Sequence, residues 1–158
     1  MSKSKAVLIR PGCTDFDEQN RIQGQLDIPL NSHGQGQVRR IVDDLRNLRL
    51  KKIYSAPCEP ARETAESLGA ELGVPVKELD SLVNLNQGLW QGMAVDEIRR
   101  KHPKVFKQWQ ESPETICPPE GEDVSDAMVR VAKAVDKILK RNVDFAIIAP
   151  EPLASIIR

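Results

Sequence analysis

Short apolar runs alternate with helical patterns along this chain, and this alternation constrains its fold more than any other feature. Three apolar runs predict buried strands, because each has at most five residues and a proline follows within two residues. They cover residues 5–9, 53–55 and 145–149. Between them, apolar residues spaced three and four apart predict amphipathic helices. The helices are expected over residues 31–48, 61–72 and 125–141. Strands alternating with helices predict an α/β fold, a three-layer α/β/α sandwich with a mostly parallel sheet.

Three further segments complete the expected order of elements. Residues 74–76 predict a short strand at the edge of the sheet, because Pro75 is poorly tolerated in a central strand. Residues 87–122 predict an excursion of short helices and loops. After Pro152 the last helix is expected to be short, since the sequence ends at Arg158, either naturally or by truncation.

The composition is that of one globular unit. With 158 residues, 40% hydrophobic and 29% charged, the chain can form one compact core, so we expect a single domain over residues 1–158 with residues 1–4 disordered. Lys+Arg and Asp+Glu are equal at 23 each, which argues against nucleic acid or an anionic membrane as partner. The first apolar run is too short for a signal peptide or a membrane-spanning helix.

The cysteines and histidines exclude several chemistries. Cys13, Cys58 and Cys117 form no C-x-x-C pair, and their odd number argues against a disulfide framework, so a cytoplasmic location is expected. No arginine stands six residues after any of them, as a thiol phosphatase would need. His33 and His102 are the only histidines, and no carboxylate cluster with ligand spacing accompanies them. Neither a metal nor a cofactor is therefore expected.

The carboxyl ends of the predicted strands carry the prolines. In a parallel sheet these ends lie along one edge, where the ligand crevice forms. The segments concerned are residues 10–12, 55–57 and 150–152. We therefore expect Pro11 and Pro150 to lie close together at one crevice.

Five sequence blocks share an order with a known family. They are RPGCT and RIQG at residues 10–24, DIPLN at 27–31, IYSAP and RETA at 53–65, GLWQG at 88–92 and PEGE at 119–122. Each block is weak alone, but together they resemble the histidine phosphatase superfamily, the phosphoglycerate mutase-like proteins. The resemblance covers residues 6–158 and implies the phosphoglycerate mutase-like fold.

The resemblance implies a phosphate pocket in which the catalytic positions differ from the family. Arg10 matches the first phosphate-binding arginine. Pro11 stands where the family has its nucleophilic histidine, and Pro150 stands where it has the second histidine. Proline has no side-chain nitrogen that could accept a phosphoryl group.

Three more pocket positions depart from the family pattern. Asp17 falls where a phosphate-binding asparagine is expected, and Pro60 falls where the second arginine should be. Asn84 matches the glutamate that donates a proton in most members, and an amide cannot give up a proton near neutral pH. Arg10 is thus the one cation expected in the pocket, opposed by Asp17 and Glu151.

These differences predict a pseudoenzyme of the superfamily, with no catalytic residue of its own. It would act as an interaction domain or weak ligand-binding domain for a protein or small-molecule partner, in an unspecified oligomeric state. Two alternatives stay open. Arg10 is either a remnant anion-binding residue or part of a plain ion pair with Asp17 or Glu151. The chain is alternatively a phosphatase or phosphoglycerate mutase with an atypical active site.

Overall fold

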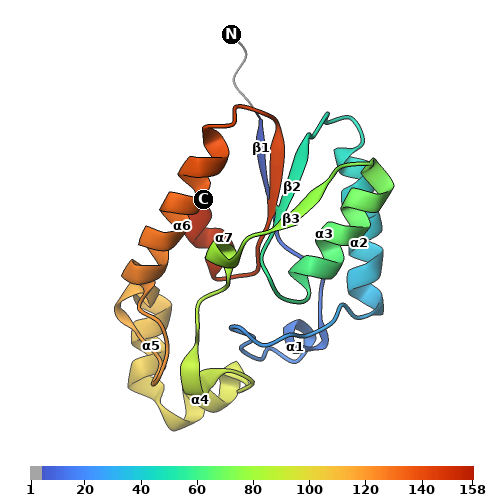
Figure 1. Cartoon of the computed structure of the whole chain (residues 1–158). Coiled ribbons are helices and arrows are strands. Elements are labelled where there is room, and N and C mark those ends of the chain that lie inside the picture. The colour runs from blue at the N-terminus through green and yellow to red at the C-terminus, as the bar shows by residue number, and fades with distance from the viewer. Residues whose placement is uncertain (1–4) are drawn as a thin grey trace.

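The computed structural model describes residues 5–158 as a four-stranded sheet between two layers of helices (Figure 1). The expected disorder of residues 1–4 lies outside the described residues. The strands are β1 (Ala6–Ile9), β2 (Lys52–Ser55), β3 (Val76–Glu78) and β4 (Phe145–Ile148). They follow the order β1-β4-β2-β3, and every neighbouring pair is parallel. The predicted α/β class with a parallel sheet is confirmed.

The helices cover both faces of this sheet. They are α1 (Asp15–Glu18), α2 (Ser32–Leu45), α3 (Ala61–Leu72), α4 (Val95–Lys101), α5 (Pro103–Glu111), α6 (Val124–Leu139) and α7 (Leu153–Ile157). In Figure 1, α2 and α3 lie on one side of the sheet and α6 and α7 lie on the other. The excursion predicted at residues 87–122 contains α4 and α5. Within the described part of the chain, no helix is both long enough and apolar enough to cross a membrane.

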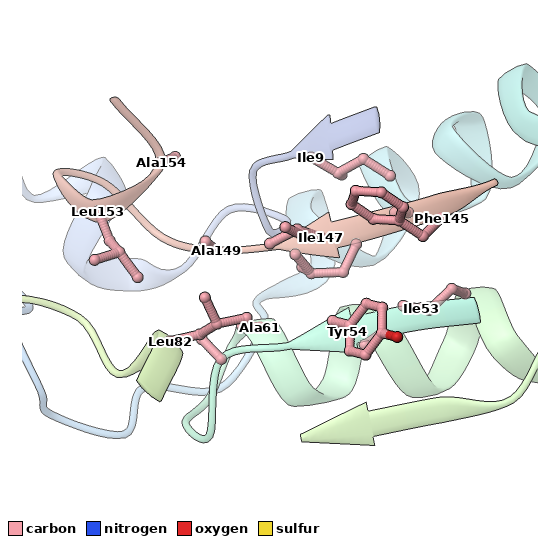
Figure 2. Packing of buried hydrophobic residues seen from close by; sticks show 14 of the residues in the cluster. Ile9, Ile53, Tyr54, Ala61, Leu82, Phe145, Ile147, Ala149, Leu153 and Ala154 are labelled. Atoms are coloured by element: carbon pink, nitrogen blue, oxygen red, sulfur yellow. The ribbon is translucent and has the colours of Figure 1, made fainter. Parts of the chain in front are cut away.

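The core forms around β4, the strand whose four residues are all buried. Figure 2 shows Phe145 and Ile147 of β4 lying between Ile9 of β1 and Tyr54 of β2. The rings of Phe145 and Tyr54 meet edge to face, with centroids 6.1 Å apart. Each such side chain stabilises the fold by roughly 1.5–3 kcal/mol through burial. A central strand with both faces covered accounts for the continuous apolar run at residues 145–149.

The edge strand begins two residues later than the sequence predicts. The backbone N–H of Val74 donates to the carbonyl of Gly69 at 3.0 Å, so Val74 still belongs to the cap of α3. The carbonyl of Pro75 accepts from the N–H of Ile53 at 3.0 Å, and Val76 then starts β3. The predicted edge position is correct, and only its start has shifted.

Helix α2 packs so closely on the loop after β1 that a glycine is required. A Cβ on Gly34 would lie 2.1 Å from the backbone oxygen of Cys13, whereas a Cβ on Gly36 would have no neighbour within 4 Å. We expect Gly34→Ala to lower the free energy of unfolding by about 1–3 kcal/mol. Gly36→Ala, in the same helix, should raise it by about 0.5–1 kcal/mol. Urea unfolding of both variants measures this difference, and equal effects would contradict the close contact.

Candidate active site

A cleft of about 790 Å³ lies at the carboxyl ends of β1 and β4. Pro11, Pro60 and Pro150 all line it, together with Arg10 and Asp17. The structure thus brings Pro11 and Pro150 to one crevice, as expected from parallel strands. Small-molecule sites commonly have volumes of roughly 300–1,000 Å³, so the cleft can hold a small ester as well as a phosphate group.

The loop after β1 is held by hydrogen bonds to neighbouring helices. The N–H of Gly12 donates to Oγ1 of Thr64 at 3.2 Å, and the N–H of Cys13 donates to Oε1 of Gln37 at 2.7 Å. Both amides are therefore engaged within the protein. A ligand at this loop would depend mainly on the side chains that line the cleft.

Arg10 follows β1 directly and points toward Glu151, which follows β4 after Pro150. Nη1 of Arg10 lies 3.9 Å from Oε1 of Glu151, with the two side chains 68% and 37% exposed. Such an exposed pair contributes only about 0–1 kcal/mol, so an anion can compete for Arg10. The other carboxylate oxygen of Glu151 accepts from Oγ of Ser155 at 2.6 Å. Of the two partners expected for Arg10, the structure selects Glu151.

Asp17 takes part in the N-terminal cap of α1. Its Oδ2 accepts from the backbone N–H of Thr14 at 2.8 Å and from Oγ1 of Thr14 at 3.2 Å. The N–H of Asp17 donates back to Oγ1 of Thr14 at 3.3 Å, which completes a capping box. Its carboxylate therefore has a structural partner, in addition to its place in the cleft wall.

Pro60 is buried at the position just before α3. Its carbonyl accepts from both the N–H and Oγ1 of Thr64, at 3.0 Å and 2.9 Å. Because Thr64 also accepts from Gly12, Pro60 is linked to the loop after β1 through this one side chain. Pro60 therefore contributes a buried apolar side chain at the position where the resemblance predicts a phosphate-binding arginine.

Asn84 does not line the cleft, although the resemblance assigns it to the pocket. Its side chain is fully buried, and its amide donates to the carbonyls of Gly24 at 2.9 Å and Glu151 at 3.1 Å. Its Oδ1 accepts from the N–H of Leu153 at 3.3 Å. Through two of these hydrogen bonds, Asn84 holds residues 151–153, the segment that contains Glu151, in place.

Two cleft arginines were missed by the sequence analysis. Arg21 and Arg40 line the same cleft, so the expectation that Arg10 is its one cation is wrong. Nη1 of Arg21 donates to the carbonyl of Gly92 at 2.8 Å. Arg40 lies on α2, three residues after Gln37, and this helical spacing was the signal that could have found it.

Cys13 also lines the cleft, but its thiol is poorly suited to act as a nucleophile. Burial raises its pKa, and the nearby carboxylates of Asp17 and Glu18 raise it further. The protonated thiol is not the reactive form. Among the charged and polar groups of the cleft, the carboxylate of Glu151 is better placed for chemistry beside Arg10.

Comparison with known proteins identifies the family that has this fold. Residues 6–149 match the Histidine phosphatase superfamily (branch 1), and the chain belongs to this superfamily. Phosphoserine phosphatase 1 of Hydrogenobacter thermophilus is 28% identical over 87% of this chain. Glucosyl-3-phosphoglycerate phosphatase of Mycobacterium tuberculosis is 30% identical over 88% of it. The chain spans 65% and 62% of the lengths of these two relatives.

Solved structures agree with this assignment. A mycobacterial glucosyl-3-phosphoglycerate phosphatase in complex with VO3 has a TM-score of 0.90 and 25% identity, and the match covers 99% of this chain and 78% of that one. YhfR of Bacillus stearothermophilus has a TM-score of 0.85 and 28% identity, over 95% of this chain and 75% of that one. Both matches extend across the sheet and both helical layers.

The prediction that the chain is not an enzyme is contradicted by these relatives, which bear the names of phosphatases. It counted only the positions of the family pattern, and so it left out Arg21 and Arg40. It also treated Glu151 only as a charge opposing Arg10, although carboxylates in general can also accept protons.

Proposed function

We propose that this chain is a phosphatase that hydrolyses phosphate monoesters of small polar molecules with an atypical active site. The observation that carries the proposal is Arg10, an exposed cation at a strand end in a cleft of small-molecule size. Within residues 5–158 its side chain is held by a single weak ion pair. The names of its relatives support the reaction class, since they denote phosphatases of phosphoserine and of a phosphoglycerate glucoside.

The proposed hydrolysis uses direct attack by water. The resemblance places Pro11 and Pro150 at both histidine positions, and no histidine in residues 5–158 lines the cleft. The water oxygen bonds to phosphorus while the ester P–O bond breaks and its electron pair goes to the leaving alkoxide. Glu151 takes the proton from the water and passes it to the alkoxide, and Arg10 stabilises the charge on the phosphoryl oxygens.

Glu151 is the preferred base for two structural reasons. Its Oε1 faces Arg10, so a phosphate bound by Arg10 would lie beside this carboxylate. The carboxylate of Asp17 also lines the cleft, but within residues 5–158 it forms no ion pair with Arg10. One oxygen of each carboxylate accepts two hydrogen bonds, from Thr14 for Asp17 and from Ser155 for Glu151, so these bonds do not distinguish the two. A mutase would need a side chain that stores the phosphoryl group between two transfers, so direct hydrolysis favours a phosphatase over a mutase.

Arg10→Ala tests the proposal directly. Purified protein should release inorganic phosphate from p-nitrophenyl phosphate, and the variant should lower kcat/KM by about 10²–10³. The matched control is Arg46→Ala, which removes another exposed arginine that is paired with a carboxylate, Asp43, away from the cleft. The control should keep the wild-type rate. Phosphate release that is absent, or that persists unchanged in Arg10→Ala, would overturn the proposal.

A further inference from the structure

We infer that Arg40 is a specificity-determining residue that binds a second anionic group of the substrate. This inference rests on the proposed function and extends it to a substrate class, phosphate monoesters that carry a carboxylate or a second phosphate. Arg40 lines the same cleft as Arg10 but comes from a different element, the middle of α2. The cleft therefore has cations on two of its walls.

The helix sets the direction of Arg40. Gln37 contacts the loop after β1, because its Oε1 accepts from the N–H of Cys13 at 2.7 Å. Residues three and four positions further on share that face, and Arg40 and Ile41 accordingly line the cleft. Arg39, the next residue round the helix, lines a separate groove between α2 and α3.

Among the described residues, none pairs with the charge of Arg40. The other charged residues that line the cleft each make a hydrogen bond or an ion pair within the protein. The side chain of Arg40 makes neither with any residue in the range 5–158, and it is exposed. Its five N–H donors are therefore available to a ligand.

The chemistry of guanidinium selects the ligand group. Its planar donors match a carboxylate or a phosphate in a two-bond geometry. A cleft of about 790 Å³ leaves room for more than one phosphoryl group, so a substrate held by Arg10 can extend toward α2. A second anion on that substrate would meet Arg40.

Matched pairs of esters test this assignment. O-phospho-L-serine and O-phosphoethanolamine differ by one carboxylate, and fructose 1,6-bisphosphate and fructose 6-phosphate differ by one phosphate. The wild type should prefer the more anionic member of at least one pair by about tenfold or more in kcat/KM. Arg40→Gln should reduce that preference to nearly one, mainly by raising KM for the preferred ester. Arg39→Gln is the matched control, and its preference should equal that of the wild type.

A binding measurement separates the possible results. The preferred ester should raise the unfolding midpoint more than its partner in the wild type but not in Arg40→Gln. Equal losses on both members of a pair would mean that Arg40 binds the reacting phosphate, and would overturn the assignment. Turnover without any preference would also overturn it, while leaving the proposed function intact. Absence of turnover on every ester would overturn the proposed function itself.

Discussion

Glu151→Gln is expected to lower kcat by about 10²–10⁴, the range commonly lost with a general base. Glutamine keeps the shape of the side chain and an oxygen that can accept from Oγ of Ser155, so the segment after β4 should stay in place. The substitution also removes the carboxylate that competes with substrate for Arg10. KM should therefore stay constant or fall while kcat drops, in contrast to Arg10→Ala, which should raise KM as well.

Chemical rescue distinguishes a base from a structural residue. Glu151→Ala opens space beside Arg10, and added formate should restore part of the lost kcat by supplying a carboxylate there. Glu66→Gln, an exposed glutamate on α3, is the matched control and should match the wild type. A loss smaller than about tenfold, or a loss that formate does not restore, would contradict the role of Glu151 as the base.

The elements with strong local patterns were the ones the sequence could predict. The fully buried β4 gave an uninterrupted apolar run, and α3 ended at Gly73, whose φ of 66° suits glycine. Helix α1 was not predicted, because its four residues are too few to show a helical period. It forms through the capping box between Thr14 and Asp17, a local signal that the sequence does contain.

The site residues at the strand ends could be located from the sequence. The residues whose positions depend on contacts between distant segments could not. Parallel strands bring their carboxyl ends together, so Pro11 and Pro150 could be placed at one crevice from the sequence. Asn84 could not be placed, because its partners Gly24 and Glu151 are 60 and 67 residues away in the chain. Arg40 was missed because only the apolar residues of its helix were used to predict structure. The polar face of the helix, which lies next to the loop after β1, was not considered.

Asn84→Asp is expected to lower the free energy of unfolding by about 3–5 kcal/mol at neutral pH, the usual effect of an uncompensated buried charge. The change removes no volume, but it replaces an amide that donates two hydrogen bonds by a carboxylate that donates none. The carbonyl oxygens of Gly24 and Glu151 would then face a negative charge in a fully buried site. Because Asn84 holds the segment that contains Glu151 in place, the proposed phosphatase activity should also fall under conditions where the fold persists.

The pH dependence gives this prediction a sign. Burial and the facing carbonyls should raise the pKa of the introduced carboxyl in the folded state above its unfolded value. The destabilisation is then fully present above the folded pKa and shrinks as the pH falls through it, since a protonated carboxyl regains one donor. Asn86→Asp is the matched control: Oδ1 of Asn86 accepts from the N–H of Gly88 at 2.8 Å, which a carboxylate does equally well. Urea unfolding of both variants at neutral and acidic pH measures the effect, and equal destabilisation of the two at neutral pH would contradict the role of the Asn84 amide.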